Sequence, residues 1–420
     1  MGGVSMEWKL KDLTVDGKGS YGIGASAVPY QEDKLTYLRI TDINDDGSLN
    51  FSDLKSVDAE DAEKYILKEN DIVFARTGNS TGRSYFYEKQ HGTFVYAGFL
   101  IKFSLDPNKV NPRILKYYTH SKPYFDWVNS FDTGATRGNI NAKTYGDMEI
   151  ELPSRKVQDK IVSILSSLDR KIELNNKINA DLEEMAQAIF KNWFVDFEPF
   201  KDGKFVDSEL GMIPEGWKVS QIVDIPHILE TGKRPKGGAV EKGIPSVGAE
   251  HVKGMCAYDY SKTKYINCEF AAKLKTGKIN GYELMIYKDG GKPGYFIPNF
   301  SIFGEGYPFE NCYLNEHVFK LDFDGNKEFN IFCYFFFKTE RIMSYFNAQG
   351  AKAAIPGINK KDVENIYIFS PDNESVIKFG EFAYPLFKQM LKNAIENRTL
   401  SLLRDTLLPR LMSGELEVPE

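Results

Sequence analysis

The chain has 420 residues, of which 42% are hydrophobic, so it is long enough to bury more than one core. Its 53 Lys and Arg residues face 59 Asp and Glu residues, a net charge of −6, which argues against a protein that grips nucleic acid by bulk positive charge. The four cysteines show no C-x-x-C spacing, so neither a disulfide framework nor a zinc site is indicated, and we expect reduced, buried thiols at Cys256, Cys268, Cys312 and Cys333.

The longest apolar run, IFCYFFF at residues 331–337, is far shorter than the ~20 residues of a membrane span, so we expect it in a core. The five residues before Met6 fit neither a signal peptide nor a myristoylation site, and we set them aside as an expression remnant. These features indicate a cytoplasmic protein.

The first part of the chain, residues 6–154, predicts a mixed α/β domain. Gly17, Gly19 and Gly22 have G-x-G-x-x-G spacing, but no helix is predicted after them, so a surface loop is the better interpretation than a dinucleotide site. Strands are predicted at residues 71–76, 94–103 and 148–152, and helical structure at 112–128.

Residues 156–194 predict one long helix that contains neither Gly nor Pro. Apolar residues recur at alternating steps of three and four, as in the seam of a coiled coil: Ile161, Ile164, Leu168, Ile178, Leu182, Met185 and Ile189. Such a helix is roughly 55 to 60 Å long, more than a small domain is wide. It must separate other parts of the chain or pair with a second helix.

The sequence supplies a second helix, because the chain resembles itself at a shift of 218 positions. This shift lays Ile140 on Ile358 and Asn175 on Asn393, with no gap between these points. The second helix is predicted at about residues 374–412, and Pro385 predicts a kink or a later start. We therefore predict an α/β protein in which two mixed α/β domains, 6–154 and 213–372, are separated by two long helices, 155–197 and 373–414, that form an antiparallel coiled coil, with a linker at 198–212.

In each half, a predicted strand ends in a Gly-rich turn with polar and basic residues. Arg can bind guanine, Asn can bind adenine, and hydroxyl groups can hold phosphate, so these turns suit DNA, although a solvated hairpin turn remains an equal alternative. The candidate DNA-binding residues here are Arg76, Thr77, Asn79, Ser80, Thr81 and Arg83 in the first half, and Lys288 and Lys292 in the second.

A second pair of segments precedes the last strand of each half, and a basic cluster opens the second half. Their candidate DNA-binding residues are Arg137, Asn139, Lys352 and Lys360, together with Lys233, Arg234 and Lys236 in the cluster. For Asn141 and Asn359, whose surroundings match closely, we expect a structural role in a turn. A solvated loop is the default alternative for the basic cluster.

Polar residues interrupt both helical seams at the same place. Asn175 and Asn393 occupy seam positions, and a polar seam residue costs stability but fixes how two helices pair. We predict that Asn175, Asn393, Leu182 and Leu400 pair the helices. The sequence contains no Walker A motif, H-E-x-x-H motif, nucleophile elbow or methyltransferase tetrapeptide, and we expect no catalysis by the chain alone and no metal site.

The chain resembles the DNA specificity (S) subunits of type I restriction-modification systems. The resemblance is carried by MAQAIFKNWFVDFEPF at residues 185–200, VDSELGMIPEGW at 206–217 and TLSLLRDTLLPRLMSGEL at 399–416. It implies two target recognition domains that each read one half of a bipartite site in double-stranded DNA, with the long helices setting the spacing.

The resemblance also implies partners: methyltransferase (M) subunits that dock on the helices, and restriction and translocase (R) subunits. S-adenosylmethionine, and ATP with Mg for restriction, would be used by those subunits in the cytoplasm of a prokaryote, and this chain would bind no cofactor. The alternative from another class is a non-catalytic coiled-coil scaffold that holds two ligand-binding modules and lacks salt-sensitive DNA binding.

Overall fold

The computed structural model describes residues 6–131, 138–290, 294–351 and 356–418, and it divides into two units. Unit 1 comprises Met1–Arg170 and Leu400–Glu420, and unit 2 comprises Lys171–Thr399. Each unit thus contains one α/β region and one part of each long helix. The predicted class, two mixed α/β regions with two long helices, is confirmed.

Unit 1 is built on two four-stranded sheets and a two-stranded ribbon. The sheet orders are β2-β9-β6-β7 and β3-β5-β4-β8, and the ribbon pairs β1 with β10. The strands are β1 (Met6–Lys9), β2 (Ser20–Tyr21), β3 (Ala27–Pro29), β4 (Thr36–Leu38), β5 (Lys55–Val57), β6 (Asp71–Ala75), β7 (Ser84–Phe86), β8 (Phe94–Tyr96), β9 (Leu100–Ser104) and β10 (Glu149–Leu152). The loop expected around Gly19 therefore contains the short strand β2.

The single strand predicted at residues 94–103 is wrong, because the structure divides it between β8 and β9, which lie in different sheets. A turn separates them, closed by a hydrogen bond from the Leu100 amide to the Ala97 carbonyl (2.8 Å). The apolar run hides this turn, since only Gly98 marks it in the sequence. Three short helices complete the α/β part of unit 1: α1 (Arg113–Tyr118), α2 (Lys122–Asn129) and α3 (Ala142–Gly146).

Unit 2 repeats this plan with longer connections. Its sheet orders are β14-β21-β18-β19-β16 and β17-β15-β20, and its ribbons pair β13 with β22 and β11 with β12. The strands are β11 (Phe205–Ser208), β12 (Gly211–Pro214), β13 (Val219–Gln221), β14 (Ile228–Thr231), β15 (Ile244–Val247), β16 (Gly254–Met255), β17 (Lys264–Ile266), β18 (Leu284–Tyr287), β19 (Phe300–Ile302), β20 (Tyr313–Leu314), β21 (Val318–Asp322) and β22 (Tyr367–Phe369).

The short helices of unit 2 are α5 (Cys268–Ala271), α6 (Lys327–Phe337), α7 (Glu340–Gly350) and α8 (Lys360–Glu364). The apolar run at residues 331–337 lies in α6 and is buried throughout, as predicted. Of the four cysteines, three are buried, but Cys268 is exposed, so the expectation of a buried thiol is wrong there. Cys268 is the first residue of α5, a single turn, and too short to enclose it.

The two units match closely at the segment that leads into each long helix. Residues 142–146 form α3 and residues 360–364 form α8, which is the shift of 218 positions seen in the sequence. The side chain of Asn141 accepts a hydrogen bond from the Thr144 amide, and that of Asn359 accepts one from the Lys361 amide. Both asparagines are therefore N-caps, which is a structural role.

Each unit also buries a carboxylate beside a lysine at matching places. Lys102 on β9 lies 3.5 Å from Asp71 on β6, and Lys320 on β21 lies 3.9 Å from Glu283, which precedes β18. Asp71 and Glu283 are 2% and 4% exposed, so a change that removed either lysine would leave a carboxylate buried without that positive charge. The strands β6 and β9, and their counterparts β18 and β21, are thus fixed to each other in the same way.

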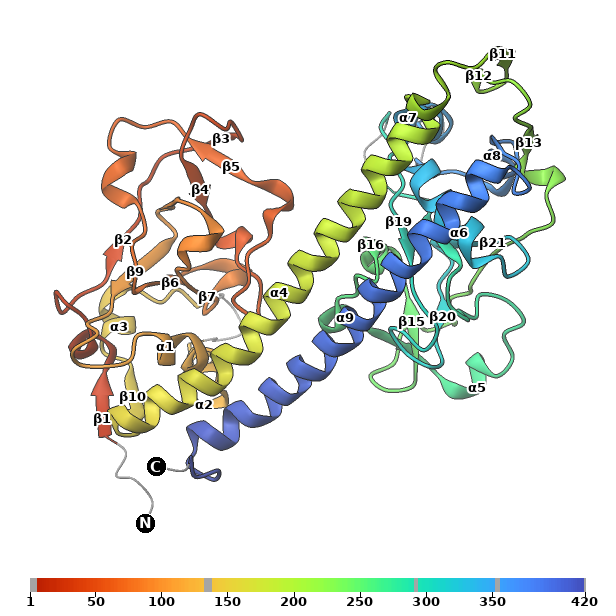
Figure 1. Cartoon of the computed structure of the whole chain (residues 1–420). Helices are drawn as coiled ribbons and strands as arrows, with labels where there is room; N and C mark the ends of the chain where they lie inside the picture. Colours follow the sequence, from red (N-terminus) through yellow and green to blue (C-terminus); the bar gives the residue numbers. More distant parts are fainter. Residues whose placement is uncertain (1–5, 132–137, 291–293, 352–355, 419–420) are drawn as a thin grey trace. The chain divides into compact units, whose positions relative to one another are not determined.

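The long helices are α4 (Arg155–Phe194) and α9 (Glu374–Met412), each an uninterrupted ribbon in Figure 1. The start at Glu374 agrees with the predicted range, and the alternative of a later start is wrong. Pro385 has no backbone N–H, so the Glu381 carbonyl, four residues earlier, lacks its helical hydrogen bond. Because Pro385 is exposed, this carbonyl lies on the solvent side of the helix.

Within unit 1, the two helices pack on each other and on the α/β core. Ile161, Leu165 and Leu408 belong to one buried cluster with Ile114 and Tyr117 of α1. Within unit 2, Phe190 contacts both Phe332 of α6 and Phe379 of α9, with ring centroids 5.3 Å apart in each case. The helices are thus parts of both cores, and this explains why they remain helical.

The predicted seam is wrong at two positions. Ile164 is 36% and Met185 47% exposed, whereas the following residues, Leu165 and Ala186, are buried. Consecutive helical residues differ by about 100° in direction, so at these two positions the buried face lies one residue later than predicted, whereas Ile161 and Asn175 are buried as the repeat indicated. The reason is that each helix buries a face against the α/β core as well as against its partner helix.

A polar layer lies where the helices pair in unit 2. Asn175 is fully buried, and its Nδ2 donates to Asn397 Oδ1 and to Glu396 Oε2, at 2.8 Å each. Asn393 is 4% exposed, and its Nδ2 donates to Asn179 Oδ1 at 2.8 Å. Since the shift of 218 exchanges Asn175 with Asn393 and Asn179 with Asn397, the two contacts are copies of each other. They require the antiparallel arrangement.

Leu182 packs against the core of unit 2, and Leu400 is partly buried. No helix in the described part of the chain has a stretch that is both long and apolar enough to cross a bilayer.

In unit 1, a buried carboxylate joins three helices. Asp169 of α4 is 9% exposed and lies 3.2 Å from Lys116 Nζ of α1 and 3.1 Å from Arg404 of α9. The Tyr117 hydroxyl donates to the same carboxylate at 3.0 Å. Burial alone would raise the pKa of Asp169, but the charges of Lys116 and Arg404, with the hydrogen bonds, hold this pKa below its ordinary value.

We predict that Asp169→Asn lowers the free energy of unfolding by about 3 kcal/mol near neutral pH, because it removes the buried carboxylate that two partly buried cations share. A carboxyl group whose folded pKa is depressed stabilises the folded state above its unfolded pKa, about 3.9, and loses this contribution as the pH falls through the folded pKa. The difference between variant and wild type should therefore shrink below about pH 4. Urea unfolding across this pH range measures it.

The matched control is Asp181→Asn, an exposed position on α4. It should change the free energy of unfolding by less than about 0.5 kcal/mol. Equal effects of the two variants at pH 7 would show that the Asp169 contacts contribute nothing beyond surface charge.

Candidate nucleic-acid interface

Two loops of unit 1 that are far apart in the sequence are held together by hydrogen bonds. The first, residues 76–83, follows β6, and the second, residues 138–142, leads into α3. The Ile140 amide donates to the Arg76 carbonyl (3.0 Å), and the Thr81 hydroxyl donates to the Gly138 carbonyl (2.9 Å). We call residues 76–83 and 138–142 the joined loops of unit 1. Both contain residues predicted to bind DNA.

The backbone of the first loop is tightly fixed. Gly82 has a φ of +87°, and a Cβ there would lie 2.5 Å from a methyl carbon of Val128 in α2. The Tyr124 hydroxyl also donates to the Gly82 carbonyl (2.6 Å). The loop therefore has one conformation imposed by the helices behind it, and its side chains project from a rigid base.

The predicted residues of the first loop differ in how available they are. Arg83 donates to Asp45 Oδ1 (2.6 Å) and to the Ile43 carbonyl (3.0 Å), so its charge is already paired. Arg76 lies over the ring of Tyr21, 5.1 Å from its centroid. Asn79 and Asn139 are exposed, Thr77 and Thr81 are partly exposed, and Ser80 is buried. Arg137 lies outside the described residues.

Unit 2 joins the matching loops by the first of these two hydrogen bonds. The Ile358 amide donates to the Lys288 carbonyl (2.7 Å), as Ile140 does to Arg76. The Lys288 amide donates to the His317 carbonyl (3.1 Å), as the Arg76 amide does to Phe99 (3.1 Å). We call residues 288–290 and 356–360 the joined loops of unit 2. Lys288 therefore stands where Arg76 stands in unit 1.

Acidic residues pair with the basic ones in unit 2. Lys288 Nζ lies 3.0 Å from Asp289, and His317 Nδ1 lies 2.7 Å from the same carboxylate. Arg234 lies 3.8 Å from Glu316, which brings the basic cluster next to the joined loops of unit 2. Lys233, Lys236 and Lys360 are exposed, whereas Lys292 and Lys352 lie outside the described residues.

Sequence reasoning missed several residues at these loops. Tyr21, Phe99, Asp289, Glu316 and His317 touch or neighbour the predicted residues, and Phe99 and Tyr21 are 58% and 43% exposed. The shift of 218 lays Phe99 on His317, directly before the matched strands β9 and β21, and this was the available signal. The pairing of Asp45 with Arg83, and of Asp289 with Lys288 and His317, could not be inferred, because it depends on the folded conformation of the loops.

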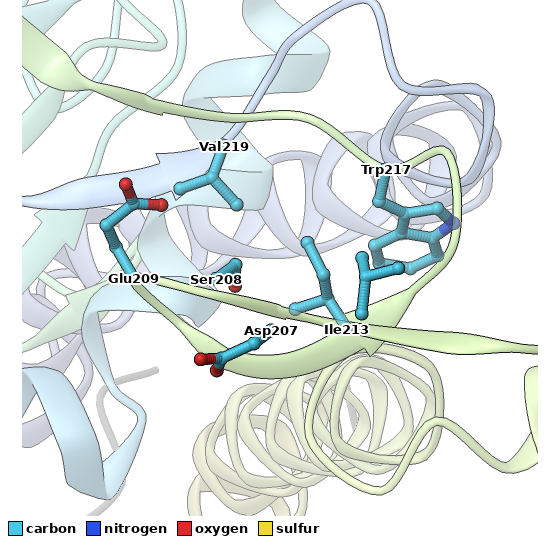
Figure 2. Close-up of a pocket in the computed structure, with 7 residues that line it drawn as sticks. Asp207, Ser208, Glu209, Ile213, Trp217 and Val219 are labelled. Atoms are coloured by element: carbon cyan, nitrogen blue, oxygen red, sulfur yellow. The ribbon is translucent and has the colours of Figure 1, made fainter.

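A surface pocket lies elsewhere, beside the β11–β12 hairpin. Figure 2 shows its lining of Val206, Asp207, Ser208, Glu209, Ile213, Trp217 and Val219. Two carboxylates and no basic side chain line it, so it does not suit the phosphates of DNA. Among the described residues, no group of three or more His, Cys, Asp or Glu side chains could hold a metal ion.

Residues 9–184 match the family model described as the type I restriction modification DNA specificity domain. The chain is 32% identical over 313 residues to the type I restriction enzyme MjaIX specificity subunit of Methanocaldococcus jannaschii, covering 73% of this chain and 69% of that protein. It is 25% identical over 415 residues to the HindI specificity subunit of Haemophilus influenzae, covering 84% and 88%.

The fold is also similar to a crystal structure of the type I restriction-modification S subunit from M. genitalium, with a TM-score of 0.54 and 15% identity over 99% of this chain and 97% of that one. At this identity the likeness concerns the fold alone. The extent of the MjaIX match is what establishes the family. The chain belongs to the DNA specificity subunits of type I restriction-modification systems, the non-catalytic subunits of those complexes.

Proposed function

We propose that each unit reads one half of a bipartite target in double-stranded DNA through its joined loops. One observation carries this proposal: in both units an isoleucine amide in the second loop donates to the carbonyl of a basic residue in the first, Ile140 to Arg76 and Ile358 to Lys288. A shared scaffold with different side chains is what two readers of different sequences would need.

Partner subunits complete the function in this proposal. Because the net charge is −6, the chain's own contacts with DNA are local, and methyltransferase subunits provide further contacts with the DNA. Those subunits, with restriction and translocase subunits, use S-adenosylmethionine and ATP with Mg, in the cytoplasm of a prokaryotic cell.

The long helices are the proposed docking surface for the methyltransferase subunits. Several large apolar side chains on them are exposed, and exposed apolar surface is typical of protein interfaces. These residues are Leu174 and Met185 on α4 and Ile377, Ile395, Leu402 and Leu403 on α9. The alternative of a scaffold that holds two unrelated ligand-binding modules loses its support, since the family is one of DNA specificity subunits.

We predict that the units are independent readers. Replacing residues 213–372 by the corresponding region of a relative should change one half of the recognised motif and leave the other half unchanged, because each unit has its own joined loops. The donor region should keep Phe332, Tyr334 and Phe335, which pack against α4 and α9. Methylation-sensitive sequencing of DNA from cells that carry the chimera and the methyltransferase subunits reads the motif.

A chimera that exchanges only the linker, residues 198–212, is the control and should retain both halves of the motif. If exchange of residues 213–372 alters both halves together, the two units do not read separately.

We further propose that the paired helices set the distance between the two half-sites. The unit boundary crosses α4 after Arg170 and α9 after Thr399, between the Asp169–Arg404 contact of unit 1 and the Lys171–Glu396 contact of unit 2. Insertions at these two points therefore lie opposite each other in the antiparallel pair. They would lengthen both helices without changing the contacts inside either unit.

We predict that four residues inserted after Arg170 and four after Thr399 lengthen the preferred spacer by about two base pairs. Four residues add ~6 Å to a helix, DNA rises ~3.4 Å per base pair, and a coiled coil accommodates this insertion by local unwinding. The measurement is the motif methylated in cells that carry the altered chain. Rotation of one reader about the helices can lower the rate, but the sequences of the half-sites should stay the same.

The control has four residues inserted after Gly203 in the linker, which should leave the spacer unchanged. Methylation at the original spacing, at the original level, by the doubly lengthened chain would contradict the role of the helices as a ruler.

A further inference from the structure

The guanidinium group of Arg76 differs from three other basic groups at or beside the joined loops, each of which has an acidic partner. Arg83 is paired with Asp45, Lys288 with Asp289, and Arg234 lies near Glu316. Among the described residues, Arg76 has no ion-pair partner, and its Nε–H is shielded from solvent and donates no hydrogen bond. Within the described ranges, a planar cation therefore lies in the joined loops without a carboxylate paired to it.

The position of Arg76 is fixed from both sides. Its amide donates to the Phe99 carbonyl and its carbonyl accepts from the Ile140 amide, so its backbone cannot shift alone. Its guanidinium lies over Tyr21, and the Tyr21 hydroxyl accepts a hydrogen bond from the Ala142 amide (3.1 Å) at the start of α3. The Tyr21 ring is thus attached to the second joined loop, and it holds the guanidinium of Arg76 by a cation–π contact.

Such an arrangement suits recognition of a base better than that of a phosphate. A phosphate needs only a positive charge, which a flexible lysine supplies, whereas a planar fork of donors fits two neighbouring acceptors. In the major groove, guanine presents N7 and O6 as such a pair, and arginine is their most common partner. A fixed, stacked arginine has lost its conformational freedom before binding, so the contact can discriminate between bases.

We propose that Arg76, supported by Tyr21, reads a guanine in the half-site of unit 1. The inference rests on the proposed function, in which unit 1 reads one half-site. It assigns no such role to Lys288 at the matched position of unit 2, because that lysine is paired with Asp289. The two readers thus share a scaffold but use different chemistry at the same place.

The first test measures binding of modified DNA by the wild-type chain, assembled with the methyltransferase subunits of its own system. Each guanine of the unit 1 half-site, on either strand, is replaced in turn by 7-deazaguanine, which lacks N7, or by inosine, which keeps N7 and O6. At one position 7-deazaguanine should weaken binding roughly 5- to 150-fold, whereas inosine should have little effect. A half-site without guanine, or without a sensitive guanine, would overturn the inference.

The second test links that guanine to Arg76. Arg76→Lys keeps the charge but not the fork, so the variant complex should bind 7-deazaguanine and guanine at that position nearly equally. Tyr21→Leu should reduce the same discrimination in part, while Lys68→Ala, the loss of an exposed charge in unit 1, should leave it intact. Thermal unfolding of each variant checks that it is folded.

The outcomes separate this inference from the function on which it rests. If Arg76 only contacts a phosphate, Arg76→Ala will weaken binding to all sequences equally. The number of ions released on binding, read from the salt dependence of the affinity, will fall by about one, and no guanine will be sensitive to 7-deazaguanine substitution. If exchange of residues 6–154 alters one half of the motif but Arg76→Lys does not affect discrimination, the Arg76 assignment alone fails. If that exchange alters neither half, the proposed function fails.

Discussion

The buried amides between α4 and α9 are the constraint on which the rest of the structure depends. Asn175 and Asn393 are buried where the two helices pair in unit 2, and an unpaired buried amide costs about 1 to 3 kcal/mol. Only one antiparallel register places Asn175 against Asn397 and Asn393 against Asn179. A slip by one helical turn would leave these groups unpaired. The polar layer therefore fixes the register of the two helices within unit 2.

The attachment of each α/β region to the helices has its own chemistry. Unit 1 uses the charged contacts of Asp169 with Lys116 and Arg404, whereas unit 2 uses aromatic packing around Phe190 and a hydrogen bond from the Tyr334 hydroxyl to Glu183 (2.5 Å). The polar layer is repeated between the two halves, but these attachments are not. The internal repeat is thus retained where α4 and α9 pair with each other. It is lost where the helices contact the α/β region of each unit.

The joined loops show the same division between scaffold and specificity. Backbone hydrogen bonds that tie Arg76 to Ile140 recur at Lys288 and Ile358, and they do not depend on side-chain identity. The side chains at the matched positions have different partners: Arg76 lies over the Tyr21 ring, whereas Lys288 pairs with Asp289. In the proposed function, recognition can therefore change by substitution in these loops without a change in the sheets that hold them.

Regular features of the chain could be predicted from the sequence, and features that depend on tertiary packing could not. The bounds of α9 and a structural role for Asn141 and Asn359 followed from periodicity and from the internal repeat, whereas their function as N-caps appears only in the structure. The seam was misplaced at Ile164 because the repeat cannot tell which face packs on an α/β core. Likewise, the loop sequences indicated which residue types suit DNA, but the Arg83–Asp45 pair, which occupies one candidate, arises only when distant loops meet.

The most direct test of two readers on one helix pair is a comparison of DNA methylation in cells that carry the methyltransferase subunits with and without this chain. Methylation-sensitive sequencing should reveal, only with the chain, a single motif made of two short specified halves around an unspecified spacer of constant length. A continuous motif, two halves at variable spacing, or the same methylated sites without the chain would contradict the account.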